Sequence, residues 1–473
     1  MIDDEGVRTE LADTGPPAAP RLEPVLGLGA IVAIGLGATF GSFILKWSIF
    51  AGPLITGAAT EVLLLYVLGG VVFICIALAF ADLAGRYPSA GGAFTYCHRS
   101  LGRFVGNLVG WCLVLEFTVF ASSAARAWAE NTFPTWPETP ASLLAAAAAF
   151  CFFLLLLLRM RAVAAIIGAL VSVQVIAVLV FIGTSAAGVG DASLYDQGVG
   201  ESALASGIPP VVLIFLAMTG FEVVAMSGED ARSPRRSLPW AIVSCVLVVL
   251  SLHLAITVVA LWSAASWGGV AAAPSHTQLI SALGGDELGT ALTTISFHVG
   301  LPAMLLALAY AQVRLYLAMS RQRFLPAWLT RVSASGAPVR LTLLCGAVTA
   351  LLAGFGPPGK LLDLAEAILP LVFAMVALSM VVTRWRAGAE EPEPETDPRF
   401  ETRVPWLVAA IAILGCGYVF LHRAPDVYLA VAGWLFAAVL ASLIAYFRGE
   451  PPSGLDPAET IVETAAEGWL DRL

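Results

Sequence analysis

Long apolar segments follow one another along almost the whole chain, and short polar loops separate them. A helix needs about 20 mostly apolar residues to cross the hydrocarbon core of a bilayer. The period-two alternation typical of an outer-membrane barrel does not occur. The pattern therefore predicts an all-α integral membrane protein with about twelve transmembrane helices. The predicted spans are residues 24–45, 54–80, 101–128, 140–158, 163–186, 208–228, 238–262, 288–319, 340–355, 361–384, 404–421 and 427–447.

The composition excludes a water-soluble globule. Only 12% of the 473 residues are charged and 59% are hydrophobic, whereas a soluble domain carries about a quarter charged residues. The net charge of −9 comes largely from a tail at residues 1–23 and a Pro-rich loop at residues 386–403. Such acidic runs are typical of solvated linkers, and no basic face for nucleic acid is present.

The seven cysteines are scattered, odd in number and without CxxC spacing. This pattern favours neither a disulfide framework nor a metal site, and we expect no metal and no cofactor.

Arginine positions predict the orientation of the spans. If the N-terminus lies inside, the outer loops receive little basic charge beyond Lys46, Lys360 and Arg423, and the inner side receives almost all the arginines. Inner loops of membrane proteins carry this excess of positive charge. We therefore expect a multi-pass protein of the cell's inner (plasma) membrane, with the loop at 191–201 outside and both termini, including the tail at 448–473, in the cytoplasm.

Two predicted spans look interrupted. The first crowds glycines at mid-depth and ends in Gly41-Ser42, and the sixth contains Met218-Thr219-Gly220 followed by the carboxylate of Glu222. Transporters built from inverted repeats place discontinuous helices at corresponding positions of their two halves, where free backbone groups face substrate. Small residues also allow ordinary close packing of helices. The matching interruption five spans later favours the functional interpretation.

Several long motifs in order resemble one known superfamily. Residues 215–222 read Phe-Leu-Ala-Met-Thr-Gly-Phe-Glu, and Gly-Glu-Asp-Ala-Arg-Ser-Pro begins at residue 228. These motifs, with those at 81–96, 109–117 and 311–326, resemble the amino acid–polyamine–organocation superfamily. Within it, bacterial amino-acid permeases and cationic amino-acid transporters are the most similar. The resemblance extends from Val25 to Phe447.

This resemblance implies a LeuT-type fold of two inverted repeats of five spans, with two peripheral helices after them. The repeats would cover residues 24–187 and 207–385, and the peripheral helices residues 404–447. The implied function is a secondary active transporter that moves an amino acid or related amine by alternating access. Its expected partners are that small molecule, the lipid bilayer, and a proton or a countersubstrate.

The resemblance also implies a substrate site. In the family, a Gly-Ser-Gly-type turn in the broken first span binds the substrate carboxylate through backbone amides. Here the turn reads Gly41, Ser42 and Phe43. A helix N-terminus suits an anion because its N–H groups are unpaired. Phe43 departs from the family pattern and predicts a smaller pocket or one shaped for another ligand. The sixth span is expected to contribute Phe215, Met218, Thr219 and Gly220.

Two further residues bear on coupling. Gln174 stands in the fifth span where proton-coupled relatives often carry lysine, and glutamine cannot lose a proton. Glu222 could carry a proton, because a low-dielectric site raises the pKa of a carboxylate. It could equally be a structural carboxylate that accepts from exposed backbone N–H groups. We expect exchange, or reliance on Glu222 for any pH dependence.

Charged residues gather where the sixth span reaches the inner side, and their role stays open. They form either a gate-side network or simple interfacial anchors, while Arg314 is expected to be structural. The residues are Glu229, Asp230, Arg232, Arg235 and Arg236.

Two other function classes remain as alternatives. A transport-fold sensor would bind an amino acid without moving it. A membrane-embedded enzyme would need a nucleophile–base pair or a HExxH-like metal pair, and the sequence contains neither. Motifs for ATP coupling are likewise missing from the sequence.

Overall fold

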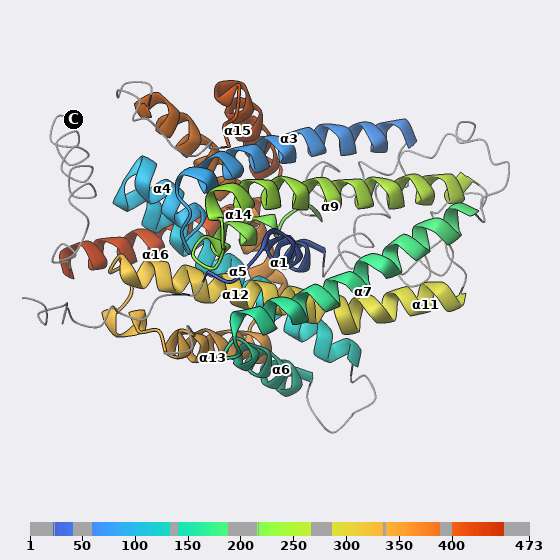
Figure 1. Cartoon of the computed structure of the whole chain (residues 1–473), viewed down its shortest axis with the longest axis horizontal. Coiled ribbons are helices and arrows are strands. Elements are labelled where there is room, and N and C mark those ends of the chain that lie inside the picture. Colours follow the sequence, from blue (N-terminus) through green and yellow to red (C-terminus); the bar gives the residue numbers. More distant parts are fainter. Residues whose placement is uncertain are drawn as a thin grey trace, which may run out of the picture.

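The computed structural model describes residues 22, 24–40, 59–132, 141–187, 215, 217–265, 286–333, 337–387 and 400–448, and their regular structure is helical (Figure 1). A single isolated bridge pairs Leu26 with Ala231. The elements are α1 (Leu28–Phe40), α3 (Ala59–Arg86), α4 (Ala93–Leu101), α5 (Arg103–Thr132), α6 (Ala141–Leu155), α7 (Met160–Ala187), η1 (Phe221–Ser227), α9 (Pro234–Ala265), α11 (Asp286–Ile295), η3 (Ser296–Gly300), α12 (Leu301–Arg321), η4 (Ala327–Thr330), α13 (Val339–Phe355), α14 (Pro358–Ala387), α15 (Pro405–Leu421) and α16 (Pro425–Arg448).

Seven helices within the described residues are long and apolar enough to cross a membrane. Shorter apolar helices lie at Leu28–Thr39, Ala141–Leu155, Val339–Phe355 and Pro405–Leu421. The prediction of an all-helical chain is confirmed. The sixth predicted span is described only in its second part, as η1 and the residues next to it.

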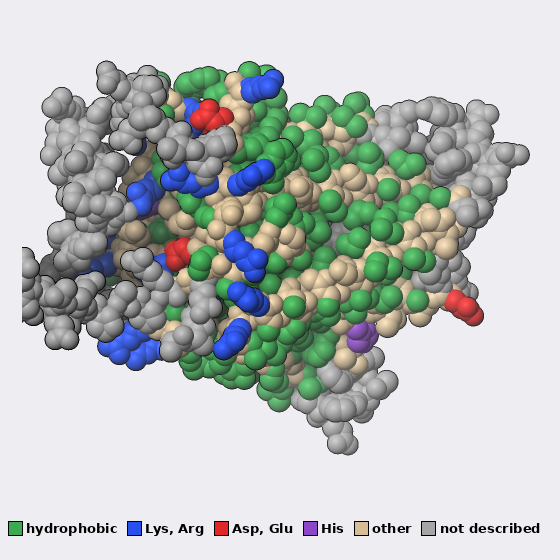
Figure 2. All heavy atoms as spheres, viewed as in Figure 1, with side chains coloured by type: hydrophobic (Ala, Val, Ile, Leu, Met, Phe, Trp, Pro, Cys, Tyr) green, Lys and Arg blue, Asp and Glu red, His purple; other side chains and the backbone are tan. Residues whose placement is uncertain are grey.

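The surface explains why such a chain needs a bilayer. Hydrophobic side chains cover the middle of the molecule, and Lys and Arg gather toward one end (Figure 2). Large apolar side chains such as Leu351, Leu414 and Leu429 are more than half exposed. A soluble monomer rarely exposes a contiguous apolar surface of this kind. The chain is therefore a multi-pass membrane protein.

Prolines lie at the starts of several helices and inside one of the longest. Pro234, Pro358, Pro405 and Pro425 each occupy the first position of a helix, where proline's missing N–H would be unpaired in any case. Pro370, in contrast, lies inside α14. It cannot donate to the carbonyl four residues earlier. Arg423 supplies the missing donor, because its Nη2 lies 3.0 Å from the carbonyl oxygen of Glu366.

A buried polar network ties α5, α12 and α13 together. Gln312 donates from Nε2 to Thr118 Oγ1 at 2.8 Å and accepts at Oε1 from Thr349 Oγ1 at 3.2 Å. All three side chains are buried. Because an unpaired polar group is expensive at membrane depth, this pairing fixes how the three helices pack. They form a scaffold beside the interrupted spans.

Two short helices were not predicted. The first, α4, has nine residues, too few to span a bilayer. It is amphipathic and lies at the arginine-rich end, with Phe94, Tyr96 and Cys97 buried. The second is the four-residue η4. A search for long apolar runs passes over elements of this length.

Candidate functional site

The first and sixth predicted spans meet at Gly220. This residue has a φ of 116°, in the left-handed region that favours glycine. A Cβ added there would lie 2.8 Å from the backbone carbon of Ala38 and from the backbone nitrogen of Thr39. Both the dihedral angle and the space therefore require glycine. The backbone just before the end of α1 and the start of η1 are in direct contact.

Glu222 caps this break. Its Oε2 accepts a hydrogen bond from the backbone N–H of Gly220 at 2.9 Å, and the residue is 1% exposed. A carboxylate in the first turn of a helical segment also suits the positive end of the peptide dipoles. Glu222 thus accepts a hydrogen bond from a backbone N–H, which is the structural role that the sequence analysis gave as one of two alternatives. A second role in proton coupling stays a prediction.

The glycines of the first span divide into two groups. A Cβ on Gly35 would overlap Val224 of η1, and one on Gly37 would lie 3.3 Å from the carbonyl oxygen of Ala303 in α12. These glycines serve close packing. Gly27 and Gly29, in contrast, have open space around the Cβ position. Close packing therefore explains part of the glycine pattern in the described half of this span.

Gln174 of α7 is joined to the eighth predicted span. It is 1% exposed, and its Nε2 donates to Ser296 Oγ at 3.0 Å. Its Oε1 has no hydrogen-bond partner among the residues that the structure describes. Gly37 packs against Val171, and Gln174 lies about one helical turn beyond Val171. The amide is therefore at the depth where α1 ends.

Ser296 opens a π-helical segment, η3, inside the long helix that runs from α11 to α12. The backbone N–H of Leu301 bonds to the carbonyl oxygen of Ser296, one residue farther back than in an α-helix. Pro302 follows directly and has no N–H for the carbonyl of His298. Such π-bulges are frequent at functional sites.

Asp230 connects three helical segments at the arginine-rich end. Its backbone oxygen accepts from the N–H of Leu26 at 2.8 Å, so the entry to α1 is bound to the segment after η1. Its carboxylate accepts from Arg314 Nε at 2.6 Å and Nη2 at 2.9 Å, and from Tyr310 Oη at 2.7 Å. Asp230 and Arg314 are 1% and 5% exposed.

Glu229 makes a second link to α12. Both of its carboxylate oxygens lie within 2.7 Å of Arg321 Nη1, and the backbone N–H of Ala90 donates to Oε1 at 3.3 Å. The side-chain partners of Glu229 and Asp230 thus come from α12. The arginines of their own segment, at 232, 235 and 236, are exposed. Arg314, expected as structural, is a direct partner of this charged cluster.

The remaining predicted site residues lie as follows. Met218 and Thr219 are buried next to Gly220. Phe215 is also buried, and its ring centroid lies 4.8 Å from that of Phe73 and 5.8 Å from that of Phe373. Gly41, Ser42 and Phe43 lie outside the described residues.

Sequence reasoning missed Ser296 and Tyr310. Both are polar residues inside apolar spans, which is the signal that could have marked them.

Comparison with known families decides what kind of protein carries this arrangement. A family model described as amino acid permease matches residues 26–444. The chain belongs to the amino acid permease family. The match covers the described helices from α1 to α15 and most of α16, so the permease is a membrane transporter by family, in agreement with its apolar composition.

The relatives of this permease differ in what their names say they carry. It is 24% identical to the methylthioribose transporter of Bacillus subtilis over 88% of this chain and 90% of that one. It is 23% identical to the branched-chain amino acid permease BcaP of the same species, over 89% and 90%. An uncharacterized transporter of Mycobacterium tuberculosis is 33% identical over 69% of this chain and 73% of its own.

Proposed function

We propose that this permease is a secondary active transporter that moves an amino acid or related amine across the cytoplasmic membrane by alternating access. In this proposal about twelve spans form a LeuT-type fold. Residues 24–187 and 207–385 are its inverted repeats, and residues 404–447 are its peripheral helices. The observation that carries the proposal is the contact at Gly220, where two interrupted spans meet deep in the protein.

The substrate would lie at this contact. The proposed site consists of Gly41, Ser42 and Phe43 after the end of α1, with Met218, Thr219 and Gly220 opposite and Phe215 behind them. Helix breaks leave N–H groups that suit a carboxylate and carbonyl groups that suit an ammonium group. Support comes from the backbone of Ala38 and Thr39 in α1, which lies directly against Gly220.

Gln174 favours an ammonium group near the same depth. Its Nε2 is engaged with Ser296, and its Oε1 is a buried acceptor without a donor. A buried acceptor that lacks a donor costs about 1–3 kcal/mol, which a ligand N–H would recover. An amino acid offers such a donor and a carboxylate. Methylthioribose, the substrate in a relative's name, would offer hydroxyl donors in place of an ammonium group, and the ligand screen below distinguishes the two.

Coupling in this proposal does not use Gln174 as a proton carrier, because an amide does not titrate near neutral pH. Transport is exchange, or any pH dependence comes from Glu222. The hydrogen bond from the N–H of Gly220 gives the Glu222 carboxylate a structural role at the break, and this contact supports exchange.

The arginine-rich end is assigned to the cytoplasm, together with both termini. This orientation follows the positive-inside rule. Single cysteines placed near Arg235 and near Asp196 test it in intact cells with an impermeant reagent. Labelling near Arg235 but not near Asp196 would reverse the orientation.

Uptake into proteoliposomes tests the function, and a thermal-shift screen against amino acids, polyamines and methylthioribose tests the ligand. A ligand that binds the native state raises its apparent stability. We expect stabilisation by an amino acid or amine, and uptake driven by countersubstrate. Stabilisation without uptake would favour a sensor, and stabilisation by the sugar alone would refute the assigned substrate class. Chemical conversion of the ligand would indicate an enzyme.

A further inference from the structure

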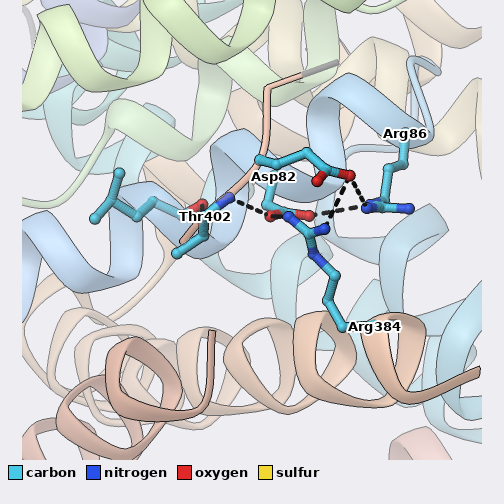
Figure 3. A network of polar contacts seen from close by, with 6 residues as sticks. Asp82, Arg86, Arg384 and Thr402 are labelled. Atoms are coloured by element: carbon cyan, nitrogen blue, oxygen red, sulfur yellow. Dashed lines mark hydrogen bonds and ion pairs between the residues drawn. The ribbon is translucent and has the colours of Figure 1, made fainter. Parts of the chain in front are cut away.

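Four charged side chains form a closed ring at the arginine-rich end (Figure 3). Asp82 and Arg86 come from α3, Arg384 comes from α14, and Glu401 lies in the segment that leads into α15. Arg86 lies 3.1 Å from Asp82 and 2.7 Å from Glu401, and Arg384 lies 2.5 Å and 2.9 Å from the same two carboxylates. Each arginine therefore bridges both acids, and the four charges cancel.

The segment Phe400–Val404, named here the strap, has no helical structure of its own and is held across this ring. The backbone N–H of Thr402 donates to Asp82 Oδ2 at 2.9 Å, and Thr402 Oγ1 donates to the carbonyl of Leu78 at 3.4 Å. At the beginning of the strap, the ring of Phe400 contacts that of Trp240 of α9 in an edge arrangement, with centroids 6.0 Å apart. Side-chain and backbone contacts thus bind the strap to α3, α9 and α14.

The two acids of the ring are exposed very differently. The side chain of Asp82 is fully buried, whereas that of Glu401 is 54% exposed. Burial makes the contacts of Asp82 costly to break one at a time. A half-exposed pair contributes little and is screened by salt. Breaking the ion pairs of Glu401 is therefore the way to open this ring that costs the least free energy.

We propose that the strap is a latch, which holds the ends of α3 and α14 together in this conformation and must release before the arginine-rich end can open. The proposal rests on the proposed function, because it assigns the strap to the alternating-access cycle. A fixed brace would need the same contacts but would never have to release. The experiment therefore has to detect release itself.

Native Cys97 reports release without any transport. It lies on α4, is fully buried, and its sulfur accepts from Ser379 Oγ of α14 at 3.4 Å. If α14 separates from its neighbours, this thiol becomes reachable. We would measure its maleimide reaction rate in the full chain with the other six cysteines replaced. Glu401→Gln should raise the rate about threefold, the effect expected from loss of the two weak, half-exposed ion pairs that Glu401 makes with Arg86 and Arg384.

Glu130→Gln is the matched control. Glu130 is 50% exposed and pairs with Arg126 at 3.0 Å, but it is not part of the ring. Its replacement should leave the Cys97 rate unchanged. An unchanged rate in Glu401→Gln, or an equal increase in both variants, would overturn the latch.

A cross-link then separates a latch from a brace. Leu78→Cys with Thr402→Cys, in a chain without native cysteines, places thiols on two residues that are joined by the hydrogen bond from Thr402 Oγ1 to the backbone carbonyl of Leu78, and mass spectrometry verifies that the disulfide has formed. Oxidation should abolish uptake, and reduction should restore it. Full uptake with the disulfide closed would refute the latch. A reduced protein that binds ligand without uptake would refute the transport function, and the Cys97 rates would still show whether Glu401 holds α14 against its neighbours.

Discussion

Asp230 and Asp82 are both buried carboxylates that bind arginine, yet their surroundings differ. Asp230 pairs with Arg314, which is itself 5% exposed, and with the buried Tyr310. Asp82 shares two arginines with Glu401, which is half exposed. The Asp230 cluster is buried away from solvent, whereas the ring around Asp82 contacts solvent mainly through Glu401. A sealed pair is little affected by salt but loses much stability when one partner is removed, whereas a ring with one exposed member can be loosened in steps.

The contacts of these two aspartates also differ in what they join. Asp230 binds the entry to α1 and the segment after η1 to α12, so it connects both interrupted spans to the scaffold. Asp82 joins α3 and α14 to the strap. We infer that Asp230 sets how the proposed site is held, and that Asp82 sets how firmly the arginine-rich end is closed.

The largest effect should follow from Arg314→Met. This change leaves Asp230 as a buried carboxylate without its cation, which costs about 3–5 kcal/mol. We expect a strong loss of stability in detergent, measured by thermal unfolding. The double variant Asp230→Leu with Arg314→Met should recover a large part of that loss, because two well-packed apolar side chains can replace a buried pair. A double variant as unstable as the sum of its two single variants would contradict a sealed pair.

A smaller effect is expected for Asp82→Asn. The asparagine oxygen in the place of Oδ2 still accepts from Arg384 and from the N–H of Thr402, so only the bond from Arg86 to Oδ1 is lost, and Glu401 remains for both arginines. The loss is that of a hydrogen bond to a charged group, about 2 kcal/mol in unfolding free energy. Thermal unfolding beside Arg314→Met gives the comparison. An equal or larger loss for Asp82→Asn would show that the ring is as sealed as the Asp230 cluster.

The all-helical architecture was predictable because each apolar run carries its own signal of length and composition. The predicted ninth span at 340–355, for example, is found as Val339–Phe355. The family was also predictable, because its motifs are local runs such as residues 215–222. Gly220 belongs with these features, since a break in an apolar span favours a residue free of Cβ.

The partners of the charged residues were not predictable in this way. Glu229 and Arg321 are separated by 92 positions, and Arg86 and Glu401 by 315. No local pattern relates residues so far apart, so the arginines nearest in sequence were the expected partners of Glu229. The bond between Gln174 and Ser296 spans 122 positions and was missed for the same reason.

Tyr310→Phe is a smaller change to the Asp230 cluster than Arg314→Met. The variant removes the hydroxyl that donates to Asp230 Oδ2 at 2.7 Å, while Arg314 still binds both carboxylate oxygens. We expect a loss of about 1 kcal/mol in unfolding free energy, the usual net value of one hydrogen bond. Uptake should persist. No measurable loss would show that the carboxylate is fully satisfied by Arg314 alone.

The smallest effect concerns salt, and it distinguishes the two clusters without removing either aspartate. Raising NaCl from about 0.1 M to about 1 M shortens the screening length from about 10 Å to about 3 Å. Screening should weaken the contacts of the half-exposed Glu401 and leave the buried Asp230–Arg314 pair unaffected. Salt should therefore lower the unfolding temperature of the wild type slightly more than that of Glu401→Gln, in which the sensitive charge is already gone.

Tyr310→Phe is the control for this salt measurement, because it alters only the sealed cluster and should respond to salt as the wild type does. The difference between the wild type and Glu401→Gln should correspond to less than about 1 kcal/mol, the range of exposed ion pairs. Identical salt responses in all three proteins would mean that Glu401 contributes no screenable energy. The ring would then be as sealed as the Asp230 cluster, and the contrast between the two aspartates would disappear.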